Sequence, residues 1–447
     1  MIDRKILKTG KCIHSQIKVK IRVFMLNVID VLKERGFIEA LTSEELRKAA
    51  TEPLKVYCGF DPTGDSLHLG NMIALMGLAW FQRCGHTPVG IIGGATGMIG
   101  DPSGKSVERQ LLDEQTIQRN LIGIRKNLET VLSYSDSQSK AIILNNLDWF
   151  KEFSFIGFLR DVGKHFRIGT MLAKDSVKTR MSTEEGMSFT EFCYQVLQGY
   201  DFLYLHQNYN VTVQMGGSDQ WGNITAGTEL VRKVLGKSVY GITFPLLTTS
   251  TGQKFGKSEK GAIWLSGDRL SPYEFYQYLV RVADADVIKM MCLLTFMDME
   301  EIRRYQSLMA RPDYVPNTAQ KRLAEEVTKI IHGDEKLQIA LKVTAGAAPG
   351  ADTELNASAL ESISGDMPNH SLKKDEAVGQ KIIDLLVKVG MQPSKGEARR
   401  LLRNGGFYLN NQQIQDENFT LDSANLIEGR LALLAVGKKN KMLLRIE

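Results

Sequence analysis

The stretch that decides the fold is LKVYCGFDPTGDSLHLGNMIALMGLAWFQRCG, residues 54–85. It runs from a short strand pattern, LKVYCGF, through the turn-forming residues DPTGDS into a segment of helical period that ends at Gly85. A second buried strand pattern, HTPVGIIGG, follows, and the strand patterns AIILNN and VTVQMGG alternate with helical patterns at 107–132 and 186–206. Strands that alternate with helices predict a parallel, doubly wound sheet, which binds ligands at the carboxyl ends of its strands.

The chain has 447 residues, too many for one ordinary core, so we expect two or three domains. Residues 27–50 have the pattern of amphipathic helices, and the pattern from about residue 260 to 345 is again mostly helical. A stretch rich in Gly, Ala, Ser, Pro and Asn then predicts a linker. The predicted architecture is α/β: a Rossmann-like parallel-sheet domain, a helical domain, a linker and a small α+β domain, at 25–258, 259–345, 346–373 and 374–447.

Composition argues against several classes of protein. Hydrophobic residues make up 43% and charged residues 24%, the balance of a soluble globular enzyme. The five cysteines are scattered without a C-x-x-C pair, which argues against a disulfide framework or a zinc site and favours a reducing compartment. No apolar run is long enough to span a bilayer. The net charge of +5 suits a nucleic-acid partner without requiring one.

Residues 1–24 form a basic extension that contains a single acid, Asp3. Such a composition is typical of an organellar presequence, and equally of a disordered tail or a misplaced start codon. We favour the two plainer interpretations and expect a cytoplasmic protein, with an organellar location as the alternative.

The segment HLGN carries the first candidate for nucleotide binding. If the helix begins near Asp65 or Ser66, then His68 and Asn71 share one face of its first turn, where free N–H groups favour phosphate. Gly70 lacks a side chain, so a purine or ribose can approach the backbone. The alternative is an ordinary surface histidine at a helix cap.

Two glycine-rich segments resemble phosphate-binding loops but fail the Walker spacing. GGATGMIGDPSGKS has Ile99 where the pattern needs glycine, and the later GKS has Thr251 there. Lys105 and Arg109 could nevertheless meet phosphates beyond the first segment. In the second, KFGKS at Lys254–Ser258 offers two lysines on a glycine-bearing loop, which can neutralise a triphosphate when the reaction needs it. Taken singly, all these charges could be ordinary solvated groups.

Together, DPTGDSLHLGN and KFGKS resemble the HIGH and KMSKS signatures of class I aminoacyl-tRNA synthetases. The match extends through YCGFDPTGDSLHLGN, GGATGMIGDPSGKS, SFTEFCYQVLQGYDF and GGSDQWGNI, and the chain after Met25 resembles bacterial-type tyrosyl-tRNA synthetases. Asn71 stands where the signature often has a second histidine, and KFGKS departs from KMSKS in its middle residues. Both lysines remain, so the resemblance still implies an active enzyme.

The resemblance implies that ATP activates L-tyrosine to tyrosyl-adenylate with release of pyrophosphate, and that the tyrosine then passes to tRNA(Tyr). ATP is expected as a substrate with Mg²⁺, without a prosthetic group or a protein metal site. A homodimer is implied as well. A tryptophanyl-tRNA synthetase and a catalytically idle RNA-binding relative are the alternatives. The pair Tyr57 and Asp201 argues against the first, and intact His68, Lys254 and Lys257 argue against the second.

The substrate residues follow from the same resemblance. In SFTEFCYQVLQGYDF, Tyr194, Gln198 and Asp201 share one helix face amid apolar neighbours, so a polar stripe there would line a cavity rather than face solvent. The implied tyrosine pocket consists of Tyr57, Asp61, Asp101, Tyr194, Gln198, Asp201 and Gln220, with the phenol hydroxyl at Tyr57 and Asp201. The implied catalytic and ATP-binding residues are Gly59, Thr63, His68, Gly70, Asn71, Lys105, Arg109, Asp219, Lys254 and Lys257.

The tail contains SKGEARRLLRNGGFYLNNQQI, which resembles an S4-like RNA-binding module. Its basic residues have near-helical spacing and precede a Gly-Gly turn into a strand. We expect a salt-dependent phosphate contact from Lys395, Arg399, Arg400 and Arg403.

Overall fold

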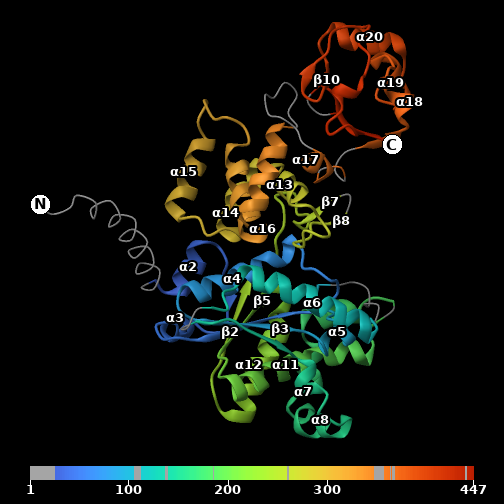
Figure 1. Ribbon diagram of the computed structural model, residues 1–447. Coiled ribbons are helices and arrows are strands. Elements are labelled where there is room, and N and C mark those ends of the chain that lie inside the picture. The colour runs from blue at the N-terminus through green and yellow to red at the C-terminus, as the bar shows by residue number, and fades with distance from the viewer. Residues whose placement is uncertain are drawn as a thin grey trace, which may run out of the picture. The chain divides into compact units, whose positions relative to one another are not determined.

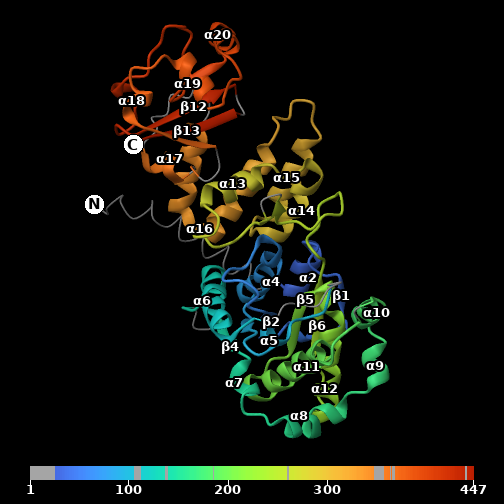
Figure 2. The ribbon, with the colours of Figure 1, turned by 90° about the vertical axis from the view of Figure 1, so that its right-hand side faces the viewer.

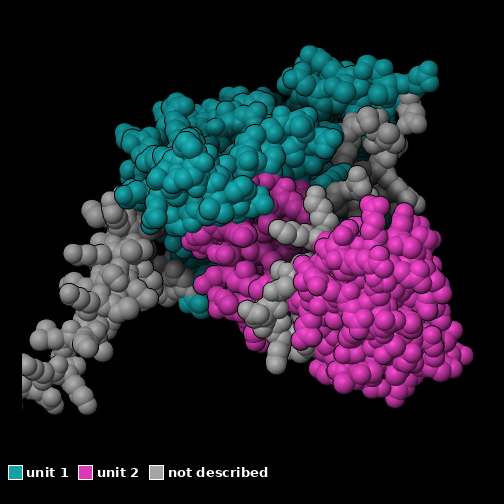
Figure 3. Space-filling model, turned by 90° about the horizontal axis from the view of Figure 1, so that it is seen from above, with its two compact units in different colours: residues 1–269, 283–319 teal, residues 270–282, 320–447 magenta. Residues whose placement is uncertain are grey.

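The computed structural model describes residues 26–104, 112–135, 139–184, 186–258, 261–346, 357–362, 364, 368–437 and 440–447. The basic extension, Lys105 and Arg109 therefore lie outside the described residues. The chain forms two compact units, coloured separately in Figure 3. Unit 1 runs to Arg269 and includes Ala283–Ala319, and unit 2 comprises Leu270–Val282 and Gln320–Glu447.

Unit 1 is built on a six-stranded sheet with the order β1-β6-β5-β2-β3-β4. Neighbouring strands from β6 to β4 are parallel, and β1 joins the edge antiparallel to β6. The predicted parallel, doubly wound sheet is therefore confirmed. The strands are β1 Ala40–Leu41, β2 Lys55–Phe60, β3 Thr87–Ile92, β4 Ile142–Asn145, β5 Val213–Gly217 and β6 Tyr240–Phe244.

The strand order fixes where a ligand would bind. The chain passes from β2 outward to β3 and β4, and then returns to the other side of β2 with β5. The direction of winding therefore reverses between β2 and β5, where Tyr57 pairs with Gln214. In doubly wound sheets the binding crevice opens at this reversal, at the carboxyl ends of the strands.

Helices cover both faces of this sheet, with α4 and α6 on one side and α11 and α12 on the other (Figures 1 and 2). The α4 helix, Met72–Arg83, is buried from Met72 to Gln82 and packs against β2 and β3. The helices on the faces are α6 Glu114–Val131, α11 Phe189–Tyr209 and α12 Trp221–Leu235. Other helices of unit 1 are α5 Thr96–Ile99, α7 Leu147–Phe150, α8 Phe155–Asp161, α9 Ile168–Leu172, α10 Asp175–Met181, α14 Asp284–Leu294 and α15 Met299–Met309.

The helices expected within residues 27–50 are present as α2 Val28–Glu34 and α3 Glu45–Ala49, with β1 between them. Another expectation from the sequence was wrong in detail. The helix after DPTGDS does not begin near Asp65, because His68 is extended and precedes the 3-10 turn Leu69–Asn71 and then α4. Backbone groups at Leu67 are instead engaged by Asn127 Oδ1 at 2.7 Å and by the Leu265 N–H at 2.9 Å, which keeps the segment out of a helix.

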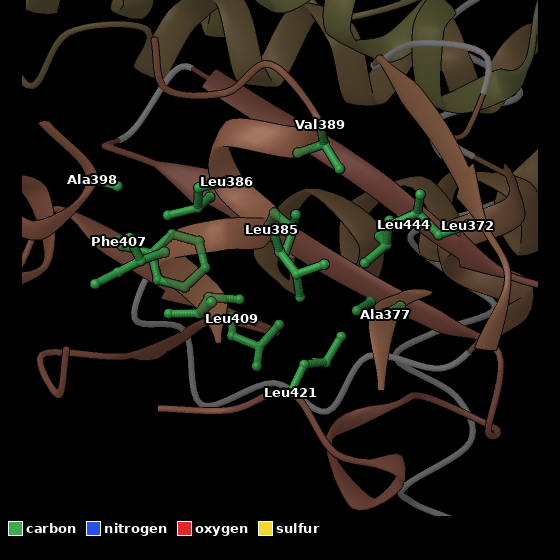
Figure 4. Close-up of a cluster of buried hydrophobic side chains, with 14 of the residues drawn as sticks. Leu372, Ala377, Leu385, Leu386, Val389, Ala398, Phe407, Leu409, Leu421 and Leu444 are labelled. Atoms are coloured by element: carbon green, nitrogen blue, oxygen red, sulfur yellow. The ribbon is translucent and has the colours of Figure 1, made fainter. Parts of the chain in front are cut away.

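Unit 2 contains α13 Pro272–Val280 and most of α16 Thr318–Gly346, which is interrupted at Gly333. Its five-stranded sheet has the order β11-β10-β12-β13-β9. Leu385 and Leu386 of one helix, with Val389 directly after it, share a buried core with strand residues such as Phe407 (Figure 4). The other elements are α17 Ala357–Ser362, α18 Lys374–Ala377, α19 Ile382–Lys388, α20 Lys395–Arg403, β9 Asn369–Leu372, β10 Phe407–Leu409, β11 Gln412–Gln413, β12 Leu431–Val436 and β13 Asn440–Ile446.

The basic helix, Gly-Gly turn and strand predicted in the tail are present as α20, Gly405–Gly406 and β10. Two elements, α17 and β9, fall inside the predicted linker, and β9 pairs with β13. Within the described part of the chain, no helix combines the length and the apolar character needed to cross a bilayer.

Candidate active site

A buried aspartate and a buried tyrosine meet beside the strand reversal. Asp201 lies on α11 and is 4% exposed, and its carboxylate accepts hydrogen bonds from Trp149 Nε1 at 2.9 Å and Asn146 Nδ2 at 3.2 Å. Burial raises the pKa of Asp201 to about 8, although these two hydrogen bonds act in the opposite direction. The charge of Asp201 also adds to the burial that raises the pKa of Tyr57, so the two groups are neighbours.

The hydroxyl of Tyr57 is a conspicuous feature of this buried cluster. Tyr57 is 1% exposed, and its Oη has no hydrogen-bond partner among the described residues. Its ring packs edge-on against Phe202 at 5.2 Å between centroids, which fixes the direction of the hydroxyl. A buried hydroxyl without a partner is costly, so this group is prepared to bond with something that enters the pocket.

A chain of hydrogen bonds connects α11 to the β2 edge. Tyr194 Oη donates to Asp61 Oδ2 at 2.9 Å, and Thr96 Oγ1 donates to Asp61 Oδ1 at 2.7 Å. Asn146 Nδ2 then donates to Thr96 Oγ1 at 3.0 Å and, as above, to Asp201. The network therefore fixes the side chains of Tyr194 and Asp201, which the sequence predicted to share one inward face of the helix. Burial, followed by the charges of Asp61 and Asp101, raises the pKa of Tyr194 well above its ordinary value.

A second polar cluster lies at the end of β5. Gln220 Nε2 donates to Asp101 Oδ2 at 2.6 Å, and the Ser103 N–H donates to Asp101 Oδ1 at 3.0 Å. Asn223 Nδ2 contacts Asp101 Oδ1 at 3.4 Å and Gln220 Oε1 at 3.2 Å. Asp101 is 7% exposed, and these hydrogen bonds fix the orientation of its carboxylate and of the Gln220 amide. The structure thus brings together two residues that the sequence assigned to one substrate.

The HLGN segment lies at the entrance of α4. The His68 N–H donates to Asn71 Oδ1 at 3.1 Å, and this closes the turn that starts the helix. The His68 ring lies 6.4 Å from that of Trp264, measured between centroids. His68 and Trp264 also form an antiparallel bridge, with the Leu69 N–H donating to Ile263 O at 2.7 Å. The backbone after KFGKS therefore pairs with the backbone of HLGN.

The KFGKS loop itself contacts the first signature. Phe255 is buried, and the Ile263 N–H donates to Gly256 O at 2.9 Å. A Cβ built on Gly256 would lie 2.9 Å from the amide nitrogen of Gly70, so the two glycines allow a close backbone approach. Lys254 and Lys257 are exposed on this loop.

Asp219 connects the loop to the β5 cluster. Burial raises the pKa of the Asp219 carboxyl and the charge of Asp101 adds to this, while the ammonium of Lys254 lowers it. The carboxylate also lies close to Gly104, since a Cβ there would be 3.3 Å from Asp219 Oδ2. Lys254, Asp219 and Asp101 therefore share one electrostatic environment. Among the other predicted site residues, Gln198 and Asn71 are half-buried, and Gly59 and Thr63 are exposed at the rim.

Sequence reasoning missed the groups that support the substrate pocket. Thr96, Asn146 and Trp149 hold Asp61 and Asp201 but were not selected as site residues. The one available signal was position, because Asn146 and Trp149 directly follow β4, where a parallel sheet places its functional side chains.

Comparison with known proteins is consistent with this geometry. A family model described as tRNA synthetases class I (W and Y) matches residues 48–345. A second model, described as the tyrosine--tRNA ligase SYY-like C-terminal domain, matches residues 359–444. The chain therefore belongs to the class I tRNA synthetases, in the group that comprises the tryptophan and tyrosine enzymes.

The relatives within that group are tyrosine enzymes. The chain is 67% identical over 422 residues to the tyrosine--tRNA ligase of Protochlamydia amoebophila, covering 94% of this chain and 99% of the relative. It is 53% identical over 431 residues to the chloroplastic/mitochondrial tyrosine--tRNA ligase of Arabidopsis thaliana, covering 95% of this chain and 84% of the relative. A C-terminally truncated mitochondrial tyrosyl-tRNA synthetase from Coccidioides posadasii is similar in structure, with a TM-score of 0.63, 32% identity, and 75% of this chain and 99% of that chain covered.

Proposed function

We propose that the chain activates L-tyrosine with ATP and then transfers the tyrosine to the terminal adenosine of tRNA(Tyr). The observation that carries this proposal is the buried hydroxyl of Tyr57, which no described residue bonds, next to the buried carboxyl of Asp201. The phenol hydroxyl of a bound tyrosine both donates and accepts hydrogen bonds, so it satisfies both groups. Phenylalanine would leave them unpaired in a buried site, and the pocket therefore selects against it.

The polar end of the amino acid fits the other cluster. Asp101 and Tyr194 supply a carboxylate and a hydroxyl oxygen, and with Gln198 they bind the α-ammonium. Gln220 binds the substrate carboxylate through an amide that the Asp101 hydrogen bond already orients. Asp61 acts mainly by holding the hydroxyl of Tyr194 in place.

ATP binds where the two signatures meet. Gly59, Gly70 and Asn71 contact the nucleotide, Asp219 bonds to its ribose, and Mg²⁺ accompanies its phosphates as part of the substrate. The tyrosine carboxylate attacks the α-phosphorus, so no enzyme nucleophile is needed and catalysis consists of positioning and charge stabilisation. Thr63 and His68 contact the transferring phosphate. The departing pyrophosphate is held by Lys254, Lys257 and the predicted pair Lys105 and Arg109.

The compact part of unit 2 that contains α20 is proposed to bind the tRNA. Lys395, Arg399, Arg400 and Arg403 are all exposed on α20. Lys395 forms an ion pair with Asp384 at 2.7 Å and Arg403 with Glu417, whereas Arg399 and Arg400 have no ion pair among the described residues. An open hollow of about 1190 Å³ beside the helix is lined by Lys381, Ile383, Asp384, Lys395, Arg399, Gln415, Asp416, Glu417 and Asn418. Because its three cations are matched by three carboxylates, the proposed phosphate contacts depend on the arginines without an ion pair rather than on the hollow as a whole.

The predicted domains are assigned roles on the same basis. Residues 25–258 form the catalytic domain, and residues 259–345 form a helical domain on the anticodon side of the tRNA. Residues 346–373 are a linker to the RNA-binding domain, residues 374–447. We propose a cytoplasmic location, with an organelle as the alternative if residues 1–24 are a presequence. Fractionation followed by N-terminal sequencing of the mature protein decides between these locations.

A homodimer is supported by exposed apolar side chains in one stretch of unit 1. Phe155 and Ile156 on α8 are 67% and 70% exposed, and Ile168 on α9 and Phe189 on α11 are 61% and 66% exposed. Large apolar side chains are unfavourable in water, so a second copy is the proposed cover. Sedimentation of wild type and a Phe155→Ser, Phe189→Ser double variant tests this, and a monomeric wild type would overturn it.

The enzymatic proposal is tested by exchange of labelled pyrophosphate into ATP with each standard amino acid in turn. Exchange with tyrosine alone is expected. Exchange with tryptophan would overturn the assignment of Tyr57 and Asp201, and folded protein without exchange would overturn the enzymatic proposal.

A further inference from the structure

The hairpin that leads into KFGKS is fastened at its tip to a buried carboxylate on α14. We propose that this carboxylate, Asp286, is a positioning residue for adenylate formation, because it sets the place of the lysine loop. The inference rests on the proposed function and adds to it a residue outside both signatures and outside the substrate pocket.

The hairpin is defined by its own hydrogen bonds. The Phe255 N–H donates to Leu247 O at 2.8 Å, and the Thr249 N–H donates to Gln253 O at 2.8 Å. At the tip, the Gly252 N–H donates to Thr249 O at 2.9 Å, and Gly252 has a φ of +82°. The lysine loop therefore continues from an ordered turn, and whatever holds the turn also restricts the lysines.

Asp286 holds this turn through both carboxylate oxygens. The Ser250 N–H donates to Oδ1 at 2.8 Å, and the Ser250 hydroxyl donates to Oδ2 at 3.3 Å. Asp286 is 4% exposed, although an aspartate is rarely buried unless its charge is compensated. It lies in the first turn of α14, where the helix dipole favours a negative charge. Charge-assisted bonds to an exposed loop tip thus anchor the hairpin to a helix.

The opposite end of α14 is fixed to the helix of the first signature. The buried guanidinium of Arg35 donates to the carbonyl oxygens of Cys292 at 2.9 Å and Thr295 at 3.1 Å. The same guanidinium lies 4.2 Å from the ring centroid of Trp80, which belongs to α4. Because α4 begins directly after HLGN, α14 links the lysine hairpin to the helix that follows His68.

The lysine loop is held at Phe255 and Gly256, and the Asp286 contact fixes the hairpin tip in addition. Without the tip contact, the hairpin is restrained less tightly, and the lysines spend less time at the departing pyrophosphate. Adenylate formation should slow, whereas tyrosine binding should not change. Transfer from preformed adenylate to tRNA should also not change, because the pyrophosphate has already left. A merely structural role would not separate these steps.

The test compares Asp286→Asn, Ser250→Ala and the double variant with wild type. Glu300→Gln is the matched control, because it removes an exposed acidic charge from the first turn of the neighbouring helix α15. Single-turnover adenylate formation, tyrosine affinity and transfer to tRNA are measured for each protein. We expect adenylate formation to fall about tenfold in Asp286→Asn and about threefold in Ser250→Ala, with a double variant no slower than Asp286→Asn.

The inference is overturned if adenylate forms at the wild-type rate in both single variants, or if transfer falls by the same factor. Ser250→Ala keeps the test valid should Asp286→Asn fold poorly, since Ser250 is exposed. Wild-type protein that forms no adenylate would instead overturn the proposed function.

Discussion

Gly256 and Gly70 come so close that a Cβ on Gly256 would lie 2.9 Å from the Gly70 amide nitrogen. Gly256 also has a φ of +83°, in the region that residues with a side chain rarely adopt. The two signature segments therefore meet through their backbones. A glycine within KFGKS is explained by this contact.

Replacing Gly256 with alanine should slow adenylate formation, because the added methyl group pushes the lysine loop away from HLGN. We expect a loss of about tenfold to a hundredfold in pyrophosphate exchange, with tyrosine affinity unchanged. Gly236→Ala is the control, since Gly236 at the end of α12 has a φ of +66° but open space where a Cβ would lie. Equal losses in both variants would attribute the effect to backbone strain and contradict the contact.

Replacing Tyr57 with phenylalanine should stabilise the free protein while it weakens the selection of tyrosine. The change removes a buried hydroxyl without a partner among the described residues, which should raise the free energy of unfolding by about 1 kcal/mol. It also removes one bond to the substrate phenol, so kcat/KM for tyrosine should fall about tenfold and that for phenylalanine should not. Denaturant unfolding and pyrophosphate exchange measure the two effects.

Tyr204→Phe is the control for this prediction, because Tyr204 stacks on Trp149 rather than on the proposed substrate. This substitution should leave the ratio of tyrosine to phenylalanine activity unchanged. A Tyr57→Phe variant that keeps the wild-type ratio would contradict the assignment of the phenol pocket.

The sheet and its inward polar helix were predictable because their signals are local. Short apolar runs such as the one around Tyr57 predict buried strands, and the spacing of Tyr194 and Asp201 predicts one helix face. The start of α4 was not predictable, because Asn127 holds the backbone at Leu67 from a helix far along the chain. Such a contact has no local signature.

The same limit applies to the candidate site. Motifs located Asp61 and Asp201, whose types and positions match a family pattern. The hydrogen bonds from Thr96, Asn146 and Trp149 that orient these carboxylates depend on which segments fold side by side. The anchoring of Ser250 by Asp286 is also of this kind, since nothing in either local sequence predicts the other.

Buried His86 should make the protein sensitive to acid. Burial lowers its pKa to about 4, and its Nδ1 accepts a hydrogen bond from the Leu54 N–H at 3.1 Å. In the unfolded chain, His86 takes up a proton as the pH falls below about 6.5, whereas in the folded chain it stays neutral down to about pH 4. The free energy of unfolding is therefore highest above pH 6.5 and decreases as the pH falls toward 4. The loss is about 3 kcal/mol.

His86→Asn, whose side-chain oxygen can still accept from Leu54, should show a smaller decrease in the free energy of unfolding between about pH 7 and about pH 4.5. His370→Asn serves as the control in unit 2. Equal decreases in wild type and His86→Asn would rule out His86 as a source of the acid sensitivity.

Replacing Arg399 and Arg400 with alanine should weaken tRNA binding and reduce its dependence on salt. Both side chains are exposed and lack an ion pair among the described residues, so each can neutralise a phosphate and release a counterion. The slope of log affinity against log salt should become shallower by roughly 0.7 to 0.9 for each arginine that contacts a phosphate. Lys388→Ala is the control, because Lys388 is held by Glu376 at 3.2 Å on α19. If the double arginine variant kept the wild-type slope, α20 would not be part of the RNA-binding surface. If the slope changes while pyrophosphate exchange does not, the effect belongs to tRNA binding alone.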